Sequence, residues 1–275
     1  MRTVKQIIKG MPATDGAGVE LTRVIGQPAL NMLDPFLLLD AFRSDKPEDY
    51  IAGFPPHPHR GFETVTYLLE GRMRHKDNAG HEGVIESGGI QWMTAARGIE
   101  HSEMPEQENG LLEGFQLWVN LPAEHKMDAP AYQEYSKEKI PVETRDDGSV
   151  IRVITGTTSK GTRGPVVQPL TEPLYLDVSL PANQQFDEVL PHLHNAFVYV
   201  INGLIDIAGN SLSRDELAIL SEGESISVNA AADDVRFLLI AGKPLNEPVA
   251  RGGPFVMNTR DEIDQAFEDY RAGRF

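Results

Sequence analysis

The sequence contains no cysteine among its 275 residues. This absence excludes disulfide bonds, thiolate metal ligands and thiol nucleophiles, so a metal site in this chain would have to use histidine and oxygen donors. A chain without disulfide bonds also fits a reducing compartment, and we expect a cytoplasmic protein.

Long apolar runs and an excess of basic residues are missing as well. No 18 apolar residues run together, and the start MRTVKQIIKGMPATDG lacks the apolar stretch of an export signal, so neither a membrane span nor secretion is expected. The 25 lysine and arginine residues are outnumbered by 41 aspartate and glutamate residues, which gives a net charge of −16. Such a surface repels phosphate backbones, so we expect no direct binding of nucleic acid.

Short β-rich runs bounded by Gly, Pro, Asn or Asp dominate the rest of the chain. The clearest are TVTYLLEG, GFQLWVNLP, VIRVITG, LYLDVSL, AFVYVING, ESISVNA and VRFLLIAG. Many short strands at this spacing predict antiparallel sandwiches or barrels and an all-β fold class. One helix is expected near the C-terminus, where Thr259 and Glu262 form a capping box ahead of an apolar stripe.

A weak internal repeat divides the chain. PPHPHRGFETVTYLLEG in the first half is echoed by LPHLHNAFVYVING at 190–203, and the strand signal fades into charge and proline around 121–141. Repeated halves typically indicate a duplicated fold. We therefore predict an N-terminal barrel at 1–135, a second barrel at 142–250 and a C-terminal tail with the helix at 251–275.

His57 and His59 form the most distinctive motif of the sequence. The prolines around them favour extended backbone, and side chains at i and i+2 of an extended chain lie on one face about 7 Å apart. His101 and Glu103 repeat this spacing, and the turns between the two pairs allow the chain to run out and back. Three imidazoles and one carboxylate suit divalent iron, nickel, copper, zinc or manganese and leave positions open for a substrate or oxygen.

The choice of carboxylate stays open from these residues alone. Glu63 has the same strand parity as the two histidines, so it could be the fourth ligand or could accept the N–H of a metal-bound imidazole. Arg60, of opposite parity, is expected to face outward, with bracing of a loop as the alternative. His75 and His81 flank a polar turn and are expected to be exposed, and no role is expected for His125.

The second half has a histidine pair without partners. No histidine follows His192 and His194 in the later strands, and Val198 stands where the first half has Glu63. A pair without further ligands binds metal poorly, so we expect one metal site, in the first half.

Four segments resemble the pirin family of the cupin superfamily. They are residues 54–71, RGIEHSEM, LLEGFQLWVNLP and GGPFVMNTRDEIDQAFEDYRAGRF, and the likeness extends along nearly the full chain. The resemblance implies two cupin barrels of the double-stranded β-helix (jelly-roll) type, of which only the N-terminal one holds a metal, commonly iron. It implies His57, His59, His101 and Glu103 as the ligands. Nickel, copper, manganese, zinc and cobalt remain candidates, because this ligand set does not select among such ions.

Cupins in general use an H-x-H-x(3)-E motif, and the spacing of His59 and Glu63 fits it. Seven residues, where the usual number is six, separate Glu63 from Gly71. This departure from the general pattern favours Glu103 as the ligand.

Several pirins resemble flavonol 2,4-dioxygenases, which open quercetin with O2 and release carbon monoxide, and this activity is the first hypothesis. The substrates would be a small aromatic flavonol and O2, with Glu103 as the catalytic base and a monomer as the expected state. The second hypothesis is a non-catalytic, metal- or redox-responsive regulator that acts through protein partners. A metal-dependent isomerase or a sugar-binding cupin is a third. Candidates for the apolar walls of an aromatic site are Phe54, Phe62, Trp92, Phe115 and Trp118.

Overall fold

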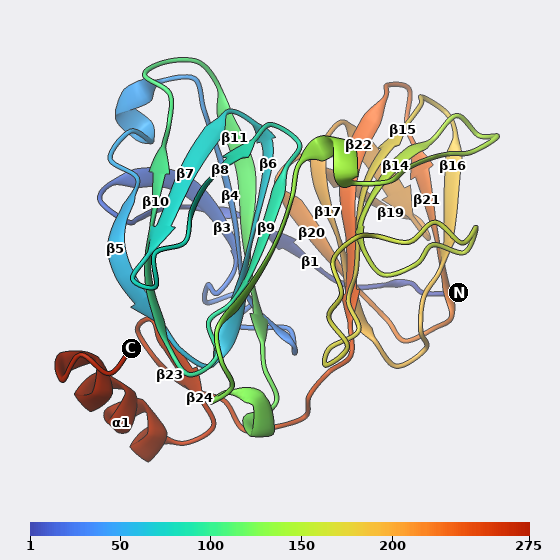
Figure 1. Ribbon diagram of the computed structural model, residues 1–275. Coiled ribbons are helices and arrows are strands. Elements are labelled where there is room, and N and C mark those ends of the chain that lie inside the picture. Colours follow the sequence, from blue (N-terminus) through green and yellow to red (C-terminus); the bar gives the residue numbers. More distant parts are fainter. The chain divides into compact units, whose positions relative to one another are not determined.

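The computed structural model describes residues 1–275. The chain is almost entirely β-structure, and its one α-helix, α1 (Arg260–Arg271), lies near the C-terminus (Figure 1). It forms two compact units, each assembled from three separated stretches. The site unit comprises Pro12–Arg23, Phe36–Lys137 and Leu245–Phe275, and the second unit comprises Met1–Met11, Val24–Pro35 and Glu138–Pro244. The all-β expectation is confirmed, whereas the boundaries 1–135, 142–250 and 251–275 stay a prediction.

The site unit contains two antiparallel sheets. Seven strands follow the order β12-β9-β6-β11-β4-β3-β2, and four follow the order β5-β10-β7-β8. Their bounds are β2 (Met11–Asp15), β3 (Val19–Ile25), β4 (Phe36–Ser44), β5 (Phe54–His59), β6 (Phe62–Glu70), β7 (Arg72–Asp77), β8 (Glu82–Glu86), β9 (Ile90–Thr94), β10 (Ile99–Pro105), β11 (Leu112–Asn120) and β12 (Ala131–Tyr135). Three short 3-10 helices lie in the chain, η1 (Pro47–Asp49), η2 (Ala123–His125) and η3 (Lys137–Lys139).

Side chains of β10 alternate strictly between buried and partly exposed positions from Ile99 to Glu103. Ile99, His101 and Glu103 are buried, and the residues between them are partly exposed, because successive side chains of a strand point to opposite faces. At the apolar part of the interior, Leu21, Phe42 and further buried residues form a hydrophobic cluster. The polar side chains of β10 therefore lie inside the same barrel as an apolar core.

The second unit repeats this plan with a different interior. Its sheets have the orders β1-β20-β17-β22-β15-β14-β13 and β16-β21-β18-β19. The strands are β1 (Val4–Lys9), β13 (Val142–Thr144), β14 (Val150–Thr155), β15 (Leu174–Leu180), β16 (Gln185–Val189), β17 (Asn195–Asn202), β18 (Leu204–Ile207), β19 (Asn210–Ser213), β20 (Glu216–Leu220), β21 (Ser225–Ala230) and β22 (Val235–Gly242). Phe186, Val198 and Phe237 are fully buried there in an apolar cluster.

The last residues belong to the site unit. After β22 the chain forms the hairpin β23 (Ala250–Gly252) and β24 (Phe255–Met257) and then α1. Thr259 accepts a hydrogen bond from the backbone N–H of Glu262, and the Glu262 carboxylate accepts one from the backbone N–H of Thr259, so the predicted capping box is confirmed. Ile263 and Ala266 of the helix are buried in a cluster with Phe255.

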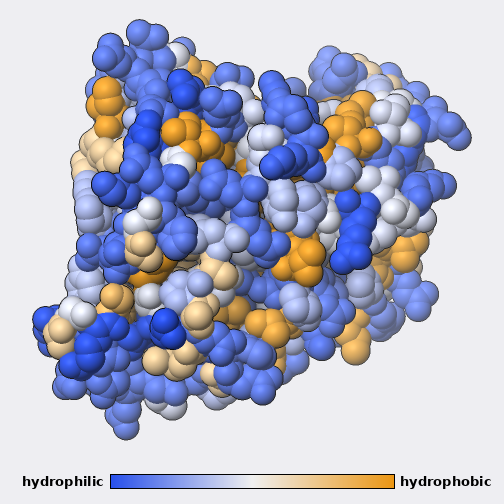
Figure 2. Space-filling view, in the orientation of Figure 1, coloured by the Kyte–Doolittle hydropathy of each residue, from blue (hydrophilic) through white to orange (hydrophobic).

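The face drawn in Figure 2 is covered mainly by hydrophilic side chains, and hydrophobic ones form small separate groups on it. No helix of this structure is long and apolar enough to span a membrane.

Candidate metal centre

Three histidines of the site unit bring their ring nitrogens together. His57 and His59 lie at the end of β5, and His101 pairs with His57 in the neighbouring antiparallel strand β10. One ring nitrogen of each lies within 4.8 Å of those of the other two, and the ring centroids are 4.5–5.1 Å apart. The i, i+2 spacing read from the sequence therefore produces one compact cluster from two strands.

Two backbone carbonyls orient the β5 histidines. Nδ1 of His57 lies 2.8 Å from the Pro55 oxygen, and Nδ1 of His59 lies 3.4 Å from the Pro254 oxygen. A carbonyl only accepts hydrogen bonds, so we assign the proton to Nδ1 in both rings. This tautomer leaves the lone pair of Nε2 available to a metal ion.

His101 has two buried ring nitrogens without a hydrogen-bond partner. Burial, followed by the charge that His57 would carry, lowers the pKa of His101 to about 3. Burial, followed by the influence of His101, places the pKa of His59 well below its ordinary value. Both rings are therefore neutral near pH 7, and the unpartnered nitrogens of His101 fit a divalent transition metal as their missing partner.

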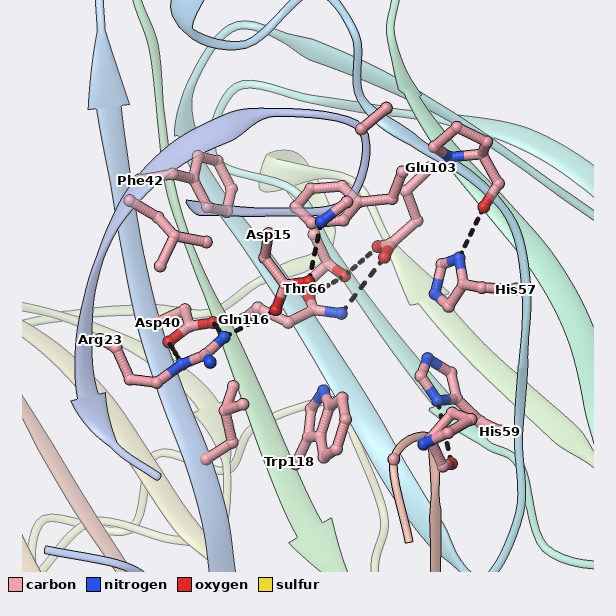
Figure 3. Close-up of a pocket in the computed structure, with 18 of the residues that line it drawn as sticks. Asp15, Arg23, Asp40, Phe42, His57, His59, Thr66, Glu103, Gln116 and Trp118 are labelled. Atoms are coloured by element: carbon pink, nitrogen blue, oxygen red, sulfur yellow. Dashed lines mark hydrogen bonds and ion pairs between the residues drawn. The ribbon is translucent and has the colours of Figure 1, made fainter. Parts of the chain in front are cut away.

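Glu103 lies beside this cluster but is held by other side chains. Its Oε2 is 4.0 Å from Nε2 of His101. Its Oε1 accepts a hydrogen bond from Thr66 Oγ1 at 2.8 Å, and its Oε2 accepts one from Gln116 Nε2 at 3.3 Å (Figure 3). The carboxylate is thus close enough to contact a metal ion bound by the histidines. Two neutral side chains, Thr66 of β6 and Gln116 of β11, fix its orientation.

Glu63 points away from the histidines. The alternation of β5 does not continue into β6, because the chain turns at Gly61 with a positive φ of 89°. Thr66, which reaches Glu103, and Glu63 are three residues apart in β6 and so lie on opposite faces. Glu63 instead accepts a hydrogen bond from Thr94 Oγ1 at 2.6 Å.

A cavity of about 530 Å³ opens beside His57, His59 and Glu103. Of the five aromatic residues expected at its walls, Phe54 and Trp118 line it. Phe62 does not line the cavity but packs on Trp118, with the two ring centroids 4.4 Å apart. Trp92 and Phe115 are buried elsewhere and do not line the cavity.

The cavity has a charged end away from the histidines (Figure 3). Arg23 donates two hydrogen bonds to Asp40, at 2.9 and 2.7 Å, and one to Asp15 at 2.7 Å. Burial raises the pKa of Asp40 in spite of the opposing effect of Arg23. The cavity therefore offers a histidine end, an aromatic wall and a polar end to one elongated, flat ligand.

Two expectations for neighbouring residues were wrong. His75 was expected to be exposed but is buried, because Glu134 of β12 lies over it with Oε2 at 3.0 Å from Nε2. Arg60 was expected to face outward but is buried in an ion pair with Asp269 of α1. His81 is exposed, as expected.

The second unit places its histidine pair differently. His192 is exposed and His194 is buried, and neither belongs to a group of three metal-type ligands. Burial lowers the pKa of His194. The three-histidine cluster of the site unit is thus the group whose spacing suits a metal ion.

Fold and site together define a two-barrel cupin in which one barrel carries a cluster of metal-type ligands. Residues 18–119 match the family model Pirin, and residues 175–275 match the model of the Pirin C-terminal cupin domain. The chain belongs to the pirin family, which confirms the resemblance noted in the sequence.

Relatives and solved structures agree with this assignment. A pirin-like protein of Caulobacter vibrioides is 54% identical over 275 residues, which cover 100% of this chain and 99% of that protein. Pirin of Homo sapiens is 45% identical over 264 residues, which cover 94% of this chain and 88% of that protein. A crystal structure of quercetin 2,3-dioxygenase from Acinetobacter baumannii is similar with a TM-score of 0.92 and 36% identity, and the match covers 100% of this chain and 98% of that one.

Six polar residues of the cavity were not predicted from the sequence. They are Asp15, Arg23, Asp40, Thr66, Gln116 and Arg251. Polar residues at interior positions of a strand are recognised only once the register of that strand is known, and the turn at Gly61 changes the parity between β5 and β6. Thr66 is one of two threonines in β6, and no local signal distinguishes it from Thr64 as a residue of this wall.

Proposed function

We propose that the protein is a metal-dependent dioxygenase that opens flavonols such as quercetin with O2 and releases carbon monoxide. The observation that carries this proposal is the cluster of three histidines beside an aromatic-walled cavity, with two buried nitrogens of His101 lacking a partner. The likeness to the crystal structure of quercetin 2,3-dioxygenase from Acinetobacter baumannii supports it.

The proposed ligands are His57, His59 and His101, with Glu103 as a fourth, and iron is the first candidate for the ion. A divalent ion bound there would act as a Lewis acid that lowers the pKa of the flavonol 3-hydroxyl. Glu103 is the proposed base that takes the proton of this hydroxyl. Its hydrogen bonds from Thr66 and Gln116 hold the accepting oxygens beside the cavity.

The remaining walls bind and orient the substrate. Trp118 and Phe54 present apolar side chains to the flat rings and exclude water from the reacting end. Phe62 supports the Trp118 ring from behind. The polar end at Arg23 and Asp40 offers hydrogen-bonding groups to the hydroxyls at the far side of a flavonol.

A quercetin assay tests the proposal. Protein loaded anaerobically with iron, nickel, copper or manganese is mixed with quercetin in air, and the loss of flavonol absorbance is followed together with the carbon monoxide formed. We expect rapid loss that disappears in His59→Ala. No loss with any of these metals would overturn the enzyme proposal and favour the regulator that acts through protein partners. The cytoplasmic location and the monomeric state stay predictions.

A further inference from the structure

One contact joins α1 to the end of β5. Arg60 directly follows His59; its side chain is 4% exposed, and Nη1 forms an ion pair with Asp269 Oδ2 at 2.7 Å. Its Nε–H donates to the Arg97 carbonyl at 2.5 Å, and its guanidinium lies 4.3 Å from the ring centroid of Phe275. Hydrogen bonds, of which that from Arg60 is the strongest influence, hold the pKa of Asp269 well below its usual range. A buried guanidinium requires such partners, so the residue next to His59 depends on the docked helix.

A second contact joins the same helix to β10. Glu100 directly precedes His101 and accepts a hydrogen bond from Tyr270 Oη at 2.5 Å. This bond raises the pKa of Tyr270. Phe275 packs on Gly98 of the same segment, where a Cβ would come 2.8 Å from the ring. The strand that carries His101 is therefore fixed by the same C-terminal residues.

The hairpin before the helix completes the attachment. The backbone N–H of Val256 donates to the Arg60 carbonyl at 3.0 Å, and Gly61 has no room for a Cβ against the Val256 backbone. The carbonyl of Pro254 orients the ring of His59. Residues 254–275 thus contact His59 and the two residues that follow it, as well as the strand of His101.

We propose that this C-terminal segment is a positioning element of the metal site. Asp269 and Tyr270 hold the strands of His59 and His101 at the separation at which the three ring nitrogens share one ion, although neither residue belongs to the ligand group. The inference rests on the metal site of the proposed function. Thermodynamic linkage makes the effect reciprocal, so metal binding stabilises the docked helix as much as the docked helix strengthens metal binding.

Cobalt(II) is the probe, because its affinity and its visible spectrum both report the ligand geometry. For Asp269→Asn and Tyr270→Phe we expect an affinity about tenfold weaker than that of the parent, measured by competition with a chelator, and a changed spectrum. Asp264→Asn is the matched control on the same helix, since Asp264 is exposed and pairs with Arg260 at 3.4 Å. It should leave both readouts unchanged.

Hydrogen exchange of the unaltered protein gives an independent measurement if a variant does not fold. Cobalt(II) should slow exchange of the α1 amides. Variants that bind cobalt(II) like the parent, or α1 exchange that does not respond to the ion, would overturn the positioning role. A parent protein that binds no cobalt(II) would overturn this role and the proposed function together. Weaker binding in the variants without quercetin turnover in the parent would overturn the proposed function alone.

Discussion

His57 and His101 face each other across the pair of strands β5 and β10, with ring centroids 4.5 Å apart. His57 is partly exposed to the cavity, whereas His101 is buried without a hydrogen-bond partner. His57 can therefore contact a ligand that enters from solvent. The ring nitrogens of His101 form no hydrogen bond in the metal-free protein. This asymmetry leads to the first two predictions.

Replacing His101 separates metal binding from stability. In His101→Leu the buried unpartnered nitrogens disappear and the apolar volume is roughly kept, so we expect the metal-free protein to be unchanged or stabilised by about 1–3 kcal/mol. Metal content, measured by elemental analysis, should fall to background. Urea unfolding of the metal-free variant checks the stability; a clear destabilisation would mean that His101 has a structural partner.

The metal-free protein should lose stability as the pH falls from about 6.5 towards 3. The pKa of His101 is about 3 in the folded protein, but the unfolded chain binds that proton near the ordinary value of about 6.5. Between these values the unfolded state holds more protons, so the free energy of unfolding decreases by up to about 1.4 kcal/mol per pH unit for this histidine.

Urea unfolding at several pH values measures this slope. Above pH 6.5 the contribution of His101 is constant. The slope should be smaller in His101→Leu, which lacks the titrating ring. An equal slope in the two proteins would assign the acid sensitivity to other groups.

Glu103→Gln should separate catalysis from metal binding. The amide keeps the size of the side chain and can still meet Thr66 and Gln116, but it cannot take a proton. We expect most of the metal occupancy to remain and kcat for quercetin to fall by about 10²–10⁴-fold. Elemental analysis measures the metal occupancy of the variant, and steady-state kinetics measures its kcat. Full activity in this variant would show that Glu103 is not the base.

Trp118→Ala should weaken substrate binding without changing the metal content. The indole lines the cavity and packs on Phe62, and its loss removes the largest apolar wall. We expect KM for quercetin to rise at least about tenfold, corresponding to about 1.4 kcal/mol. Titration of metal-loaded protein under anaerobic conditions measures binding directly, and an unchanged affinity would place the flavonol elsewhere.

Lys126→Met should destabilise the site unit. The ammonium group is buried and donates to Gly61, Asn120 and Val256, at 2.6, 2.6 and 3.1 Å. Burial lowers the pKa of Lys126 to about 8. Its loss leaves three buried acceptors without a donor, so we expect a cost of at least about 2 kcal/mol in urea unfolding. An unchanged free energy of unfolding would mean that water replaces the ammonium group.

Local patterns predicted the strands and the histidine pairs, because parity and proline act within a few residues. The meeting of His57, His59 and His101 followed from two pairs with the same spacing on strands joined by turns. The same parity rule misplaced Glu63, since a single positive-φ glycine intervenes. The burial of His75 and Arg60 depends on Glu134 and Asp269, distant in sequence, and no local pattern contains such contacts.

Each end of the chain belongs to the unit that is formed mainly by the other half of the chain. β1 pairs with β20 in the second unit, whereas Leu245–Phe275 returns to the site unit. During synthesis on the ribosome, β1 therefore has no partner strand until β20, more than 200 positions later, has been made. The histidine cluster, made early, acquires its final surroundings only when the last residues emerge. The site unit is thus completed late, and we expect neither half of the polypeptide, expressed alone, to fold as a complete unit, because each unit draws residues from both halves.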